Sequence, residues 1–207
     1  MNKTNNEKPA IVFDLGGVLI DWNPYYLYCD KLGMKPQDVD RFLKEVKFSE
    51  WNKQNDRGRA FAESTVELSS EFPQYRELIH AYDDRYLETI GGSIQPVVEL
   101  LSKLKSAGLP LYVLSNWPTE KFALVRPLYE FFDWFDDLII SGDVGMIKPD
   151  RDIFELLLQR IGRSAEECVF IDDHTPNITA ARELGFKTIL FKSAPQLETD
   201  LKQVQLI

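Results

Sequence analysis

Polar residues stand at or just after four short apolar runs of the chain, where their side chains could act together on one ligand. The runs cover residues 10–13, 109–114, 138–140 and 168–171. The polar residues that follow them are Asp14, Ser115 with Asn116, Lys148, and Asp172 with Asp173. If the runs are parallel strands of one sheet, these groups meet at a single edge of that sheet.

Three carboxylates at one edge repel each other, and each raises the pKa of the others unless a cation neutralises them. A hard, oxygen-liganded ion such as Mg²⁺ suits this set of ligands. An ion, a lysine, a hydroxyl group and the N–H groups of turns together form a receptor for a phosphoryl group. One carboxylate is then left to act as a nucleophile.

The elements that must position these residues alternate between strands and helices. The apolar runs, with a fifth at residues 187–191, are nearly continuous in hydrophobicity, as is typical of buried parallel strands. Helical patterns cover residues 96–107, 152–161 and 177–184, and each is followed by a glycine. This order predicts an α/β fold with a doubly wound, Rossmann-like parallel sheet.

A long insertion separates the first strand from the next strand and helix. Residues 22–93 are too many for a loop, and they contain helical patterns at 24–32, 36–46, 60–70 and 75–89 without a convincing strand. We therefore expect a small α-helical cap domain at residues 22–93. It would be inserted into a core domain formed by residues 1–21 and 94–207.

Composition narrows the class of protein. The chain has 207 residues, of which 44% are hydrophobic, enough for a substantial core. Lys and Arg total 24 against 33 Asp and Glu, and the net charge of -9 argues against binding to nucleic acid or an anionic membrane. Cys29 and Cys168 lack metal-ligand spacing, and the polar N-terminus has no apolar signal segment. We expect a cytoplasmic protein whose oligomeric state the sequence leaves open.

The motifs, taken in order, resemble those of the haloacid dehalogenase superfamily over most of the chain. Residues 13–18 (FDLGGV), 113–116 (VLSN), 148–149 (KP) and 170–173 (FIDD) with Asn177 look like the family's four motifs. The resemblance implies a helical cap after the first motif and Mg²⁺ as cofactor. It also implies roles for particular residues: Asp14 as nucleophile; Ser115, Asn116 and Lys148 as holders of the phosphoryl group; and Asp14, Gly16, Asp172 and Asp173 around the metal.

One position departs from the pattern of the family's phosphatases. They usually carry a second Asp two residues after the nucleophile, which protonates the leaving oxygen and later activates water. Gly16 occupies that position here, so only its backbone carbonyl, a metal ligand in the family, is retained. Loss of a positioned acid–base group typically costs a factor on the order of 10²–10⁴ in rate. Either another group substitutes or turnover is slow, although some sugar-phosphate phosphatases of the superfamily share the Asp-Leu-Gly pattern.

Other residues have both a functional and a structural interpretation. Trp22, Arg57, Trp117 and His174 are candidate substrate contacts, and residues 51–52 and 55–57 fall where caps of this class often reach the active site. Trp22 could instead bury the cap against the core. His174 could be a structural or solvent-facing imidazole, and Ser115 and Asn116 could cap the following helix.

These observations favour a Mg²⁺-dependent phosphatase acting on a small phosphomonoester, such as a sugar phosphate, through an aspartyl phosphate. One alternative is a 2-haloacid dehalogenase, in which the same nucleophile attacks carbon without a metal. The acidic pair Asp172 and Asp173 argues against it, because two adjacent carboxylates call for a cation. Another alternative, supported by Gly16, is a catalytically weak binding or regulatory module that keeps the phosphate site.

Overall fold

The computed structural model describes residues 8–207, and a five-stranded sheet with parallel neighbours lies at its centre. In spatial order the strands are β5 (Asp137–Ile140), β4 (Leu111–Ser115), β1 (Ala10–Phe13), β6 (Cys168–Asp172) and β7 (Lys187–Leu190). They coincide with the five predicted strands to within two residues at each end. The predicted doubly wound α/β core is confirmed.

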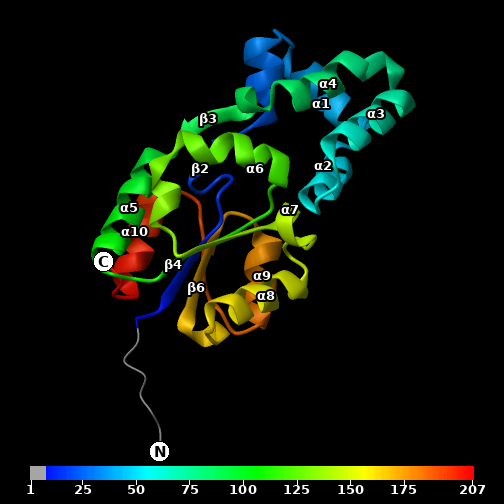
Figure 1. Ribbon diagram of the computed structural model, residues 1–207. Coiled ribbons are helices and arrows are strands. Elements are labelled where there is room, and N and C mark those ends of the chain that lie inside the picture. Colours follow the sequence, from blue (N-terminus) through cyan, green and yellow to red (C-terminus); the bar gives the residue numbers. More distant parts are fainter. Residues whose placement is uncertain (1–7) are drawn as a thin grey trace, which may run out of the picture.

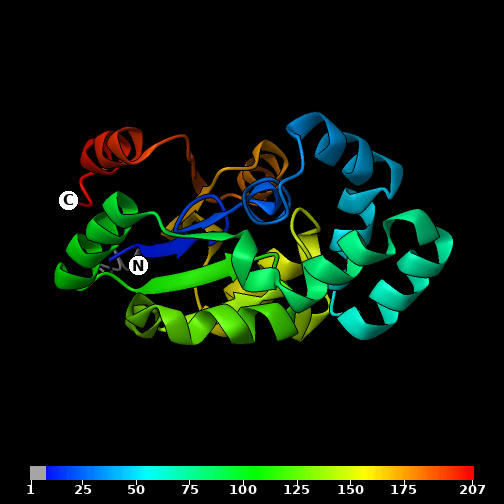
Figure 2. The same cartoon turned by 90° about the horizontal axis from the view of Figure 1, so that it is seen from above.

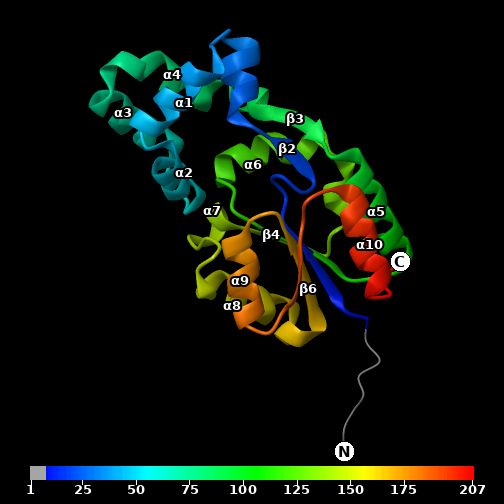
Figure 3. The ribbon, with the colours of Figure 1, turned by 180° about the vertical axis from the view of Figure 1, so that it is seen from behind.

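The central strand β1 is fully buried because helices cover both faces of the sheet. Ile11 and Phe13 belong to one hydrophobic cluster, whereas Ala10 and Val12 belong to another on the opposite face. The helices α5 (Gln95–Ser106) and α10 (Ala194–Gln203) cover the first face, and α8 (Arg151–Ile161) and α9 (Thr175–Glu183) cover the second, as Figures 1 and 3 show from the two sides. Within residues 8–207, no helix has both the length and the apolar character needed to cross a bilayer.

A helical insertion, residues 23–89, lies between two short strands. β2 (Ile20–Trp22) and β3 (Ile90–Ser93) pair antiparallel and form its stem. The insertion contains a π-helical turn (Tyr26–Lys31), α1 (Pro36–Glu45), α2 (Phe48–Asp56), α3 (Phe61–Glu71) and α4 (Arg76–Asp84). Figure 2 shows these helices gathered beyond one end of the sheet. The expectation that no strand occurs in this stretch is wrong, because β3 has the sequence Ile-Gly-Gly-Ser and so lacks the hydrophobic pattern of a strand.

Aromatic rings form the interior of the insertion. The ring of Tyr82 lies 4.9 Å from that of Phe48, 5.7 Å from Trp51 and 5.5 Å from Tyr86, measured between centroids. Lys121 of α6 (Thr119–Val125) reaches this cluster from the core, and its ammonium donates to the carbonyl oxygen of Asp83 at 2.8 Å. The insertion is thus attached to the core by packing and hydrogen bonding as well as by its stem.

Replacing Phe154 of α8 with Ala should destabilise the core strongly. The centroid of its ring lies 5.5 Å from that of Phe170 of β6 and 5.8 Å from that of Phe186. Truncation to Ala therefore leaves a cavity beneath the sheet. We expect the free energy of unfolding in urea to fall by about 3–5 kcal/mol. Leu124→Ala is the control, because Leu124 is 45% exposed and its loss should change stability by about 0.5 kcal/mol or less. A loss below about 1 kcal/mol for Phe154→Ala would contradict the packing described.

Candidate active site

The carboxyl ends of three adjacent strands bring the first predicted residues together. Asp14 directly follows β1, Ser115 ends β4, and Asp172 ends β6. Because β4, β1 and β6 are neighbours in register, these ends lie side by side. The Ser115 hydroxyl donates to Asp14 Oδ1 at 2.8 Å, and the backbone N–H of Leu15 donates to the same oxygen at 2.7 Å.

The Lys148 ammonium joins two of the carboxylates. Its Nζ lies 3.0 Å from Asp14 Oδ1 and 2.7 Å from Asp172 Oδ2, and the residue is only 2% exposed. Burial alone would lower the pKa of Lys148, but Asp14 and Asp172 raise it above its ordinary value. The lysine is therefore held as a cation between two carboxyl groups.

Asn116 fixes the backbone of Lys148. Its amide NH₂ donates to the Lys148 carbonyl oxygen at 2.9 Å, and its amide oxygen accepts from the Lys148 N–H at 2.8 Å. The Asn116 amide thus connects the end of β4 to the loop that carries the lysine. The expectation that Asn116 binds phosphate stays a prediction.

Asp172 is held from several sides. The Asn177 amide donates to its Oδ2 at 3.0 Å, and the backbone N–H of His174 donates to its Oδ1 at 2.7 Å. Burial raises the pKa of Asp172, but Lys148 and these hydrogen bonds outweigh that effect and hold the pKa below its ordinary value. Asp172 is therefore an ionised anchor for Lys148 and for the start of α9.

Asp14, Asp172 and Asp173 form a group whose carboxylate oxygens lie within 4.8 Å of one another. Burial raises the pKa of Asp14 to about 7 despite the opposing effect of Lys148. Burial and the charge of Asp172 also raise the pKa of Asp173. With one lysine among three carboxylates, the group retains an excess of negative charge, and its oxygen donors fit a hard divalent cation such as Mg²⁺.

Two glycines of the first motif shape this part of the site. Gly17 has a φ of +75°, and a Cβ built on it would lie 2.2 Å from Asp173 Oδ2, so only glycine allows that carboxylate to approach. A Cβ built on Gly16 would meet no atom within 4 Å. The position where the family's phosphatases usually carry an acid is thus open and sterically free to accept a side chain.

The four candidate substrate residues have different environments. Trp117 is buried and Trp22 half-buried, and both indole N–H groups are enclosed near the Tyr86 hydroxyl without a well-formed hydrogen bond among residues 8–207. Arg57 is exposed and forms an ion pair with Asp150, two residues after Lys148. His174 is exposed and contacts the site through its backbone N–H, so it is not buried among the reacting groups.

Asp56 is a buried acid to which no sequence motif assigns a role, although it lies within residues 55–57, where caps of this class often reach the active site. Asp56 ends α2 and is only 7% exposed, and its Oδ2 accepts from the Asn52 amide at 3.2 Å. Burial raises its pKa to about 7, against opposing effects of that hydrogen bond and of Lys148. A single acid at the end of a polar helix has no sequence signal of its own, because its burial arises from tertiary contact.

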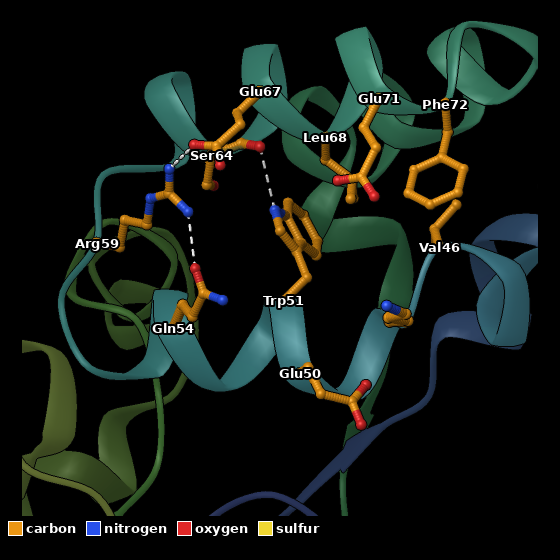
Figure 4. Close-up of a pocket in the computed structure, with 11 residues that line it drawn as sticks. Val46, Glu50, Trp51, Gln54, Arg59, Ser64, Glu67, Leu68, Glu71 and Phe72 are labelled. Atoms are coloured by element: carbon orange, nitrogen blue, oxygen red, sulfur yellow. Dashed lines mark hydrogen bonds and ion pairs between the residues drawn. The ribbon is translucent and has the colours of Figure 1, made fainter.

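A hollow of about 150 Å³ lies elsewhere, between α2 and α3 of the insertion (Figure 4). Its polar lining is occupied internally: Arg59 donates to Gln54 at 2.7 Å, and the Trp51 indole donates to the Ser64 carbonyl oxygen at 3.2 Å. The hollow does not include the residues around Asp14.

Comparison with known proteins agrees with this arrangement. The model of a family described as haloacid dehalogenase-like hydrolase matches residues 8–185. The chain belongs to this family. The match includes β1, the insertion, Lys148 and both acidic residues of the fourth motif.

This haloacid dehalogenase-like hydrolase has phosphatases among its relatives. It is 31% identical over 180 residues to a sesquiterpene phosphatase of Aspergillus oryzae, covering 85% of this chain and 86% of that protein. A HAD-like family hydrolase from Porphyromonas gingivalis has a TM-score of 0.72 at 23% identity, covering 96% of this chain and 98% of the other. A family enzyme from Bacteroides thetaiotaomicron, solved with magnesium and inorganic phosphate, has a TM-score of 0.67 at 23% identity. The match covers 90% of this chain and 95% of the other. The two structures share the fold.

Replacing Lys148 with Met should destabilise the protein in a pH-dependent way. Without the ammonium, Asp14 and Asp172 remain buried and uncompensated, and we expect a loss of about 3–5 kcal/mol at pH 7 in the presence of a chelator. The lowered pKa of Asp172 stabilises the wild-type fold above the unfolded-state pKa of about 3.9, and this stability is lost as pH falls. The difference between variant and wild type should therefore shrink toward pH 4 in urea titrations.

Lys103→Met is the matched control, because the Lys103 ammonium is exposed and pairs with Glu198 at 3.3 Å on the surface. Its effect should stay below about 1 kcal/mol at both pH values. A loss for Lys148→Met that is equally large at pH 4 and pH 7 would assign the effect to packing and not to charge.

Proposed function

We propose that this hydrolase is a Mg²⁺-dependent phosphatase that hydrolyses a small phosphomonoester through an aspartyl phosphate on Asp14. Residues 22–93 would act as its cap domain. The contact of Lys148 with both Asp14 and Asp172 carries the proposal. It supports a site in which a cation stands beside a carboxylate nucleophile, ready to receive the oxygens of a phosphoryl group.

Asp14 is held in an orientation that suits attack on phosphorus. Leu15 N, Ser115 Oγ and Lys148 Nζ all contact its Oδ1, so Oδ2 is the oxygen we assign to the attack. Ser115 and Lys148 would turn to the phosphoryl oxygens once the ligand is bound. Their donors would then stabilise the charge that develops in the transition state.

The donor set supports Mg²⁺ as the cofactor. We assign Asp14, Asp173 and the carbonyl oxygen of Gly16 as its protein ligands. We place Asp172 behind them, because its oxygens already accept from Lys148, Asn177 and the His174 N–H. When bound, the ion would neutralise the carboxylates and polarise the phosphoryl group.

The substrate we favour is a small metabolite such as a sugar phosphate. Asp14 is only 8% exposed beneath the insertion, which leaves little room for a large group. The sesquiterpene phosphatase relative makes an isoprenoid phosphate the competing class. A screen of phosphorylated sugars beside prenyl phosphates distinguishes the two.

Asp14→Asn should abolish phosphatase turnover while leaving the fold intact. The amide keeps the shape of the side chain and its contact with Ser115 but lacks the nucleophilic charge. Hydrolysis of 4-nitrophenyl phosphate and the circular dichroism spectrum are measured together. Residual activity near the wild-type level would remove Asp14 from the mechanism.

Activity should require Mg²⁺, and Asp173→Ala should weaken binding of the ion more than Asp172→Asn does. Asp173 contributes an exposed carboxylate to the cluster, whereas Asp172 is committed to Lys148. Calorimetric titration with Mg²⁺ gives the affinities, and assays in excess EDTA give the requirement. Full hydrolysis of 2-chloropropionate in EDTA would favour the dehalogenase. Binding of vanadate without any turnover would favour a regulatory module.

A further inference from the structure

We propose that Asp56, at the end of α2, is the general acid and base that this site lacks at Gly16. The proposal rests on the phosphatase function proposed above. It assigns the acid and base to a residue of the helical insertion, whereas the first motif supplies only the backbone of Gly16.

Contacts with the core fix the end of α2 beside the phosphate-binding residues. The Ser141 hydroxyl donates to the Asp56 carbonyl oxygen at 2.6 Å and accepts from the Trp117 N–H at 2.9 Å. Ser141 begins α7 (Ser141–Val144) directly after β5, and Trp117 follows Ser115 and Asn116. Figure 1 shows the end of α2 reaching α7. Asp56 is therefore tied to the sheet edge where the phosphoryl group would bind.

The backbone of the following turn also approaches the core closely. A Cβ built on Gly58, which has a φ of +91°, would lie 2.7 Å from the carbonyl oxygen of Gly142. Arg57, in the same turn, forms an ion pair with Asp150, two residues after Lys148. The turn after Asp56 thus meets both α7 and the loop that carries Lys148.

The environment of the Asp56 carboxyl group suits proton transfer. Lys148 is near enough to lower its pKa, Asn52 donates to it, and its charge acts on the hydroxyl groups of Tyr82 and Tyr86. Burial outweighs the lowering effects and brings the pKa to about 7. A carboxyl group with this pKa can donate a proton at neutral pH and, once ionised, accept one.

The proposed reaction has two steps. In the first, Asp14 forms a bond to phosphorus, the bond to the leaving oxygen breaks, and that oxygen takes its electron pair and the proton of Asp56. In the second, the Asp56 carboxylate accepts a proton from water as the water oxygen bonds to phosphorus. The bond from phosphorus to Asp14 then breaks, returning the electron pair to the Asp14 carboxylate and leaving Asp56 protonated.

The test is the dependence of kcat/KM on the leaving group, measured with Mg²⁺ and substituted phenyl phosphates from 4-nitrophenyl to 4-methoxyphenyl phosphate. Wild-type protein should give a shallow slope of log(kcat/KM) against leaving-group pKa, because the leaving oxygen is protonated. Asp56→Asn should steepen it, losing a factor on the order of 10²–10⁴ for phenyl phosphate. The same variant should lose much less for 4-nitrophenyl phosphate, whose leaving group needs no proton. It should also release one equivalent of nitrophenolate in a burst, since the second step lacks its base.

Gly16→Asp provides the rescue, because the space at Gly16 is open. The double variant Gly16→Asp/Asp56→Asn should return to a shallow slope. Glu45→Gln is the control for loss of a carboxylate in the insertion, since Glu45 is exposed and accepts from the Tyr75 hydroxyl. It should behave as wild type.

The proposal is overturned if Asp56→Asn keeps the wild-type slope, or if the wild-type protein itself gives a steep slope. The second result applies even if Asp56→Asn does not fold, which circular dichroism will show. Absence of aryl phosphate hydrolysis by wild-type protein would instead remove the proposed phosphatase function itself. The two failures are therefore distinguishable.

Discussion

The buried cation Lys148 is the constraint on which the rest of the site depends. Two carboxylates at the ends of neighbouring strands could not both remain ionised beneath the insertion without a compensating charge, because burial favours the protonated form of each. The ammonium contacts both of them, and Asn116 fixes its backbone. Asn177 and the start of α9 complete the support of Asp172. The parallel sheet supplies the positions, and Lys148 allows acidic residues to occupy them.

The helical insertion completes the site from the opposite side. Its interior of aromatic rings makes it a packed unit, and its stem of β2 and β3 leaves the sheet beside the first motif. The Ser141 hydroxyl of α7 donates to the carbonyl oxygen of Asp56 and so joins the end of α2 to the core. Residues distant in sequence, such as Asp56 and Trp117, therefore share one small region above the sheet edge. In the mechanism we propose, the first motif would supply a nucleophile without a proton donor, so the chemistry would depend on how the two parts meet.

The core and the motif residues could be predicted from sequence because both are local signals. Each buried strand is an apolar run, and Asp14, Ser115 and Asp172 come where those runs end. Helix α2 was missed because its nine residues contain only two apolar side chains, and because α1 leads to it through Lys47, with a φ of +50°, without a Gly or Pro break. The strand β3 was missed because two of its four residues are glycine. Asp56 could not be found in this way, since its pKa depends on contacts made only in the folded protein.

The burial of Asp56 would couple any movement of the insertion to the pH of the solution. Asp14 is only 8% exposed, and a movement that admitted substrate by separating α2 from α7 would also return water to the Asp56 carboxyl group. In water the pKa of Asp56 would fall toward its ordinary value of about 4, and at neutral pH the group would be ionised. Re-forming the contact with Ser141 would restore the pKa to about 7, at which the group is about half protonated at neutral pH. Closing of the insertion would therefore take up part of a proton, and its equilibrium would depend on pH.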